Sequence, residues 1–92
     1  MDPIGSMMLT LQGAKADGEK LLKQNRYEEA LGCYNVALQI AMQLGIREDE
    51  VAKIFSNRSL VFAKLGSALN ALSDAEQCIG LNPKWWKVGH FL

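Results

Sequence analysis

The chain has 92 residues, with ten Lys plus Arg against ten Asp plus Glu, and 49% of its residues are hydrophobic. This length allows one small domain with a single core, and the apolar content excludes a disordered chain. Because the formal net charge is zero, a general nucleic-acid binder and a polybasic membrane anchor are both disfavoured. We therefore expect no nucleic-acid partner and no membrane attachment.

Residues 1–7 show no helical pattern and include Gly-Ser before the methionine at position 7. We interpret them as a remnant of an expression tag or a disordered N-terminus. They carry no signal-peptide pattern, and the longest apolar stretch, at residues 36–46, is too short to span a bilayer. Both observations favour a cytoplasmic location.

Residues 8–44 predict a pair of helices. Apolar or small residues recur with helical spacing in residues 8–23, at Leu11, Ala14, Gly18, Leu21 and Leu22. The same spacing returns in residues 27–44, at Tyr27, Ala30, Leu31, Tyr34, Ala37, Leu38, Ala41 and Leu44. Asn25, between the two helices, suits a left-handed backbone, and Gly45 ends the second helix.

Residues 48–81 predict a second pair. The third helix begins in an acidic run, continues to residue 65 and ends at Gly66. Its apolar side carries Val51, Ile54, Phe55, Val61, Phe62 and Leu65. In the fourth helix, residues 68–81, we expect inward positions at Leu69, Ala71, Leu72, Ala75, Cys78 and Ile79. Asn82-Pro83 then opens a fifth helix at residues 83–92.

The second pair of helices repeats the first after a shift of 41 residues. This shift aligns Ala30 with Ala71 and Leu31 with Leu72, so the matches fall mostly at inward positions. A helical hairpin cannot bury its apolar face alone and has to stack on a neighbour. We therefore predict an all-α fold of stacked helical hairpins rather than a four-helix bundle.

This pattern resembles the tetratricopeptide repeat, in which small and aromatic residues recur at fixed steps of a helical hairpin. The first copy supplies Gly18, Tyr27, Ala30, Tyr34 and Ala37, and the second supplies Ser59, Phe62, Gly66, Ala71 and Pro83. Ala68, Ala75 and Cys78 depart from the pattern in the second copy. The resemblance implies an α–α superhelix with one repeat at residues 8–44, a second at 48–81 and the first helix of a third at 83–92.

Residues 55–59 and 82–87 are similar to those of co-chaperones that carry a dicarboxylate clamp. Such domains bind the acidic C-terminal tails of the seventy- and ninety-kilodalton heat-shock chaperones, which end in Glu-Glu-Val-Asp. The resemblance implies that Lys15, Asn57 and Lys87 contact the peptide. Glu19 and Phe91 stand at the other two clamp positions and depart from the pattern.

The departure at Glu19 reverses the charge that a carboxylate clamp needs. Glu19 lies one helical turn from both Lys15 and Lys23, so we expect it to pair with one of them and to repel an acidic tail. Lys23, Lys53 and Lys64 would also line the groove under the resemblance. The alternative is that these three lysines are solvated charges on helix surfaces.

The sequence contains no motif for a metal, a cofactor or catalysis. Cys33 and Cys78 have no CxxC or HxxxH pattern, so we interpret them as reduced, buried side chains. His90 has no Cys, Asp or Glu at ligand spacing, and no phosphate loop or nucleophile elbow is present. We therefore predict a non-enzymatic adaptor, without a cofactor, that binds an acidic peptide in its concave groove.

An assembly scaffold that associates through apolar helix faces, without a carboxylate clamp, is the alternative function. The fifth helix carries Trp85, Trp86 and Phe91, and no later helix is present to cover them. The tryptophans could serve as a ligand platform or pack onto the second repeat. A homo-oligomer that forms through the C-terminal helix would also bury this apolar surface.

Overall fold

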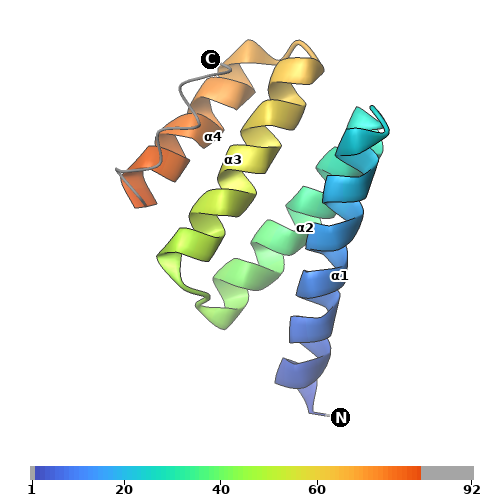
Figure 1. Cartoon of the computed structure of the whole chain (residues 1–92). Helices are drawn as coiled ribbons and strands as arrows, with labels where there is room; N and C mark the ends of the chain where they lie inside the picture. Colours follow the sequence, from blue (N-terminus) through green and yellow to red (C-terminus); the bar gives the residue numbers. More distant parts are fainter. Residues whose placement is uncertain (1, 82–92) are drawn as a thin grey trace.

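The computed structural model describes residues 2–81 of the chain. Four helices follow one another: α1 (Pro3–Lys23), α2 (Tyr27–Leu44), α3 (Glu48–Lys64) and α4 (Ala68–Leu81), with no strand among the described residues. Figure 1 shows two hairpins in which α1 and α3 run in one direction and α2 and α4 in the other. The predicted all-α fold is confirmed for this part of the chain. The fifth helix expected at residues 83–92 lies outside the described residues.

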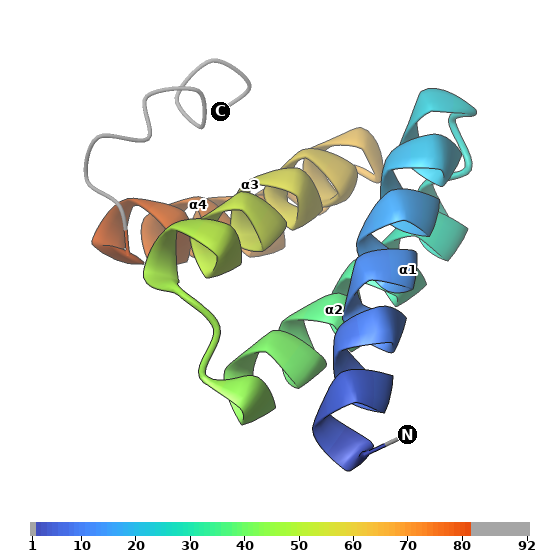
Figure 2. The same cartoon turned by 60° about the horizontal axis from the view of Figure 1, so that its bottom comes forward.

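The four helices form an open stack. Helix α1 packs on α2, α2 on α3, and α3 on α4. In a closed four-helix bundle α1 and α4 would also pack extensively on each other, and here they do not. Figure 2 shows α1 and α3 together on one face, in front of α2 and α4. The stack therefore has a face made by the first helix of each hairpin.

The helix ends follow from residues that accept a left-handed backbone. Asn25 has φ 60°, Gly45 φ 63° and Gly66 φ 80°. Glycine has no Cβ to clash at such angles, and asparagine tolerates them better than most residues. These three positions separate the four helices, as the sequence predicts.

Helix α1 begins at Pro3, so the expected start at residue 8 is wrong. The Asp2 side chain caps the helix by accepting a hydrogen bond from the Gly5 backbone N–H at 2.6 Å. Pro3 fits the first helical position because its missing N–H is not needed there. Capping therefore extends α1 through residues 3–7, which are helical rather than disordered although they show no apolar periodicity.

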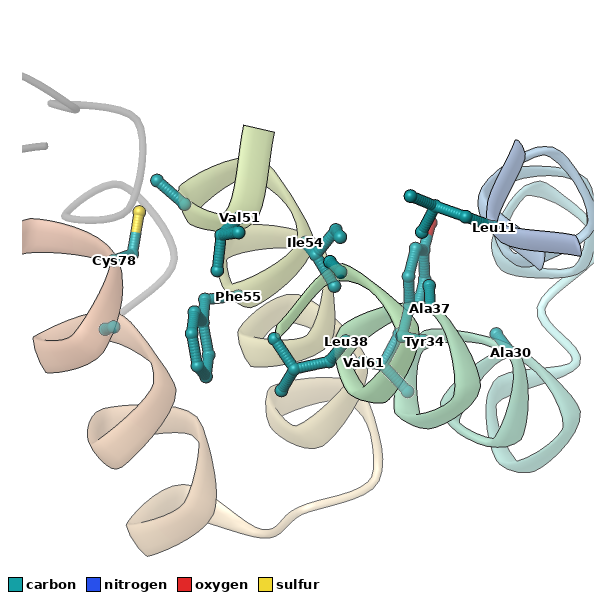
Figure 3. Close-up of a cluster of buried hydrophobic side chains, with 13 residues drawn as sticks. Leu11, Ala30, Tyr34, Ala37, Leu38, Val51, Ile54, Phe55, Val61 and Cys78 are labelled. Atoms are coloured by element: carbon teal, nitrogen blue, oxygen red, sulfur yellow. The ribbon is translucent and has the colours of Figure 1, made fainter. Parts of the chain in front are cut away.

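Each hairpin crosses at a small residue. A Cβ placed on Gly18 would lie 2.8 Å from Cζ of Tyr34, so only glycine lets the tyrosine ring lie against α1. In the second hairpin the Ser59 hydroxyl donates a hydrogen bond to the Ala71 carbonyl at 2.7 Å. Figure 3 shows Tyr34 rising from α2 beside Leu11 in the hydrophobic core.

Arg58 joins α2, α3 and α4. Its Nε and Nη2 donate to the two carboxylate oxygens of Asp74 at 2.7 Å each, and its Nη1 donates to Asn35 at 3.0 Å. Its guanidinium carbon also lies 5.6 Å from the ring centroids of both Phe55 and Phe62. A bidentate pair with stacked aromatic rings fixes the position of a side chain more strictly than a single ion pair does.

Three apolar residues of α4 face outward, so the expectation that they point inward is wrong. Leu69 is 84% exposed, Leu72 47% and Ile79 46%, whereas Ala71, Ala75 and Cys78 are buried. Among the described elements α3 is the one helix on which α4 packs extensively, whereas α2 packs on both α1 and α3. A helix with one neighbour buries only a narrow stripe, so the wider apolar stripe of α4 is left uncovered within residues 2–81.

A candidate peptide-binding groove

Three of the predicted site residues lie together in one cavity between α1 and α3. The cavity has a volume of about 360 Å³ and is lined by Lys15, Glu19, Tyr34, Glu50, Lys53, Ile54 and Asn57. Residues of α1 and α3 form its walls, and Tyr34 reaches it from α2. The stacking of the two hairpins therefore brings Lys15, Lys53 and Asn57 together, and their contact with a peptide stays a prediction.

Glu50 already pairs with both lysines of this groove. Its carboxylate accepts a hydrogen bond from Lys15 Nζ at 3.0 Å and lies 3.7 Å from Lys53 Nζ. The hydrogen bond from Lys15 lowers the pKa of the Glu50 carboxyl, and the charges of Lys15 and Lys53 lower it further. The sequence analysis did not identify Glu50 as a site residue, because its place in the first turn of α3 is explained by the helix dipole alone.

Glu19 lines the groove without pairing with Lys15 or Lys23. The expected i, i+4 pair is therefore absent among the described residues, because Lys15 reaches across to α3 instead. The groove thus holds two lysines, Lys15 and Lys53, and two glutamates, Glu19 and Glu50. These four side chains carry no net charge, so an acidic ligand has to compete with the carboxylates of the protein itself.

Tyr34 contributes a hydroxyl to the lining of the groove, although the sequence analysis assigned this residue only to packing. The residue is 1% exposed, and its hydroxyl makes no well-formed hydrogen bond with any described residue. Burial raises the pKa of Tyr34 to about 12, with a further increase from the charge of Glu19. A weak hydrogen-bonding contact with the Asn57 side chain opposes this increase. The hydroxyl is therefore a protonated donor at neutral pH.

The other predicted peptide contacts lie away from this cavity or outside the described residues. Lys23 and Lys64 are exposed in the last turns of α1 and α3 and do not line the groove. Lys87 and Phe91, with Trp85 and Trp86, fall in residues 82–92, which the structure does not describe. A role for any of them in peptide binding stays a prediction.

A larger and shallower hollow, of about 640 Å³, lies between α1 and α2. It is lined by Thr10, Gly13, Ala14, Asp17, Leu21, Glu29, Gly32, Cys33 and Val36. Burial raises the pKa of the Cys33 thiol, and the charges of Asp17 and Glu29 raise it further. A hollow whose only charged residues are acidic repels an acidic peptide, so the groove between α1 and α3 is the better candidate.

Neither a metal cluster nor a membrane-spanning helix is found among the described residues. No group of three or more His, Cys, Asp or Glu side chains that could hold a metal ion occurs within residues 2–81. In this part of the chain no helix is both long and apolar enough to cross a membrane.

Comparison with curated proteins finds relatives that align with most of this chain. Over 70 residues it is 37% identical to the Hsp70-Hsp90 organizing protein of Triticum aestivum, an alignment that covers 76% of this chain and 11% of that protein. It is 38% identical over 74 residues to Hsp70-Hsp90 organizing protein 1 of Glycine max, covering 80% of this chain and 12% of the relative. This chain is a tetratricopeptide-repeat domain.

The tetratricopeptide-repeat domain spans about a tenth of the length of these relatives. It is also 28% identical, over 81 residues, to heat shock protein STI1 of Saccharomyces cerevisiae, with coverage of 88% of this chain and 13% of that protein. No family model matches the domain, and no solved structure matches it significantly. The family assignment therefore depends on the curated relatives, the repeat pattern and the helical hairpins together.

Proposed function

We propose that this tetratricopeptide-repeat domain is a non-enzymatic adaptor that binds the acidic C-terminus of a partner protein in the groove between α1 and α3. The observation that carries the proposal is the convergence of Lys15, Lys53 and Asn57 on one cavity. Ammonium groups and an amide can bind a carboxylate through charge-assisted hydrogen bonds. The relatives named Hsp70-Hsp90 organizing proteins support a heat-shock chaperone as the partner.

Binding of such a peptide would exchange one carboxylate for another. Lys15 and Lys53 now pair with Glu50, and these groups are partly exposed to solvent. A peptide carboxylate would take the place of Glu50 beside Lys15 and accept a hydrogen bond from Asn57. Because one ion pair is broken when another forms, we expect weak affinity that falls as salt concentration rises.

Calorimetric titration with a peptide ending in Glu-Glu-Val-Asp tests this function. Asn57→Ala should weaken binding roughly tenfold to a hundredfold, because a hydrogen bond to a charged group is lost. The matched control is Asn70→Ala, since Asn70 is exposed on α4 and does not line the groove. Lys87→Ala tests the predicted contact outside the described residues. No binding at millimolar peptide would refute the adaptor proposal.

The exposed face of α4 favours assembly as a second candidate function. Leu69, Leu72 and Ile79 share one side of α4 at helical spacing, and each is at least 46% exposed. A second copy or a scaffold partner could cover this side. Light scattering over a concentration series tests self-association, with Leu69→Ser expected to weaken it and Ser73→Ala as a control. A wild-type domain that stays monomeric at high concentration would refute self-association.

A further inference from the structure

The Tyr34 hydroxyl is a buried donor without a well-formed hydrogen bond among the described residues. The tyrosine is 1% exposed, and its oxygen is excluded from solvent. A buried polar group that makes no hydrogen bond destabilises a fold, and nearly all buried polar groups in native proteins do have a partner. Phenylalanine would fill the same space without this penalty. Packing therefore explains the ring of Tyr34 and leaves the hydroxyl unexplained.

The position of the hydroxyl connects it to the groove. The ring end of Tyr34 lies against Gly18 of α1, where a Cβ would come within 2.8 Å of Cζ. Tyr34 lines the same cavity as Lys15, Glu50 and Asn57, and a weak hydrogen-bonding contact with the Asn57 side chain acts to lower its pKa. Figure 3 shows the oxygen at the far end of the ring, away from α2. The donor therefore lies at the α1 side of the cavity, beside two predicted peptide contacts.

We propose that Tyr34 is a ligand-binding residue of this groove, whose hydroxyl donates a hydrogen bond to a carboxylate of the bound acidic peptide. This inference rests on the proposed function. The Lys15–Glu50 ion pair joins the two walls of the cavity in the free domain. A peptide carboxylate that takes Lys15 from Glu50 separates these walls and reaches the hydroxyl. Two carboxylate oxygens offer about four lone-pair sites, enough for Lys15, Asn57 and Tyr34 together.

The test compares Tyr34→Phe with Tyr27→Phe. Both changes remove one hydroxyl from α2, but the Tyr27 hydroxyl donates to Asn25 at 2.8 Å on the surface and does not line the groove. Peptide affinity is measured by calorimetry and stability by thermal unfolding without peptide. We expect Tyr34→Phe to weaken binding roughly tenfold to a hundredfold and to leave the melting temperature unchanged or higher. Tyr27→Phe should leave affinity unchanged.

The two measurements separate this inference from the function on which it rests. If Tyr34→Phe binds the peptide as tightly as the wild-type domain does, the role of the hydroxyl is overturned and the proposed function is not. A lower melting temperature for Tyr34→Phe would show that the hydroxyl is bonded within the fold, through Asn57 or an internal water, and would also overturn it. A wild-type domain that binds no acidic peptide would overturn the proposed function, and this inference with it.

Discussion

The pairing of Glu50 with the groove lysines predicts that Glu50→Gln strengthens binding of an acidic peptide. In the wild-type domain a ligand has to displace Glu50 from Lys15, at 3.0 Å, and from Lys53, at 3.7 Å. The side chains of these three residues are between 24% and 49% exposed, so each ion pair is worth only about 0.2–1 kcal/mol. Removal of the competing charge should therefore raise affinity by about 0.5–1.5 kcal/mol, or roughly twofold to tenfold.

The assay is a calorimetric titration of each variant with one peptide at low and at physiological salt. Glu48→Gln is the matched control, because Glu48 also lies in the first turn of α3, is exposed and does not line the groove. Both variants lose one negative charge, so a purely long-range effect would raise affinity equally in both. A gain confined to Glu50→Gln supports displacement. Weaker binding by Glu50→Gln would refute it and would mean that Glu50 holds the lysines in place for the ligand.

Three further predictions concern stability. Gly18→Ala should destabilise the fold, because the overpacking against Tyr34 costs about 1–3 kcal/mol and the better helix propensity of alanine offsets only about 1 kcal/mol of this cost. The added methyl group of Gly13→Ala meets nothing within 4 Å, so this variant should stabilise the fold by up to about 1 kcal/mol. Thermal unfolding of the two variants checks the sign of each effect. Asp74→Ala should cost about 3–5 kcal/mol in urea unfolding, because Asp74 is buried and Arg58 loses its bidentate partner; a loss under 1 kcal/mol would contradict this. The pKa of Glu50 is lowered in the folded state, so its contribution to stability is present above the unfolded pKa of 4.5 and is lost as pH falls through the folded value. A urea series between pH 3 and 7 should therefore show a shallower acid decline for Glu50→Gln.

The helices could be predicted from the sequence because their determinants are local. Asn25, Gly45 and Gly66 mark the breaks between helices, and apolar spacing marks the helices themselves. The outward side of α4 could not be predicted in the same way. Spacing tells which residues share a side of a helix, but the number of neighbouring helices decides how wide a buried stripe becomes. Leu69 and Ile79 are therefore apolar and exposed.

The candidate site was predicted only in part, because it depends on contacts between hairpins. Lys15 and Asn57 came from the resemblance to a known clamp, and the structure places both in one cavity. Glu50 contacts Lys15 across 35 positions of sequence, a pair that no helical spacing indicates. Glu19 was expected to pair with that lysine or with Lys23, since i, i+4 pairs are the ones that a single helix predicts. An acidic residue aligned with the groove face of α3 is the signal that could have identified Glu50.

The crossing of α1 and α2 also constrains how such repeats can diverge. In the first hairpin a glycine, Gly18, lies under a tyrosine, Tyr34. In the second hairpin the equivalent positions hold a serine, Ser59, and an alanine, Ala75, both buried. The two positions share one volume, so a larger residue in one helix requires a smaller residue in the other. Related sequences should therefore show these positions changing as a pair, and a graft between the two hairpins that moves only one member should destabilise the fold, through a clash or through a cavity.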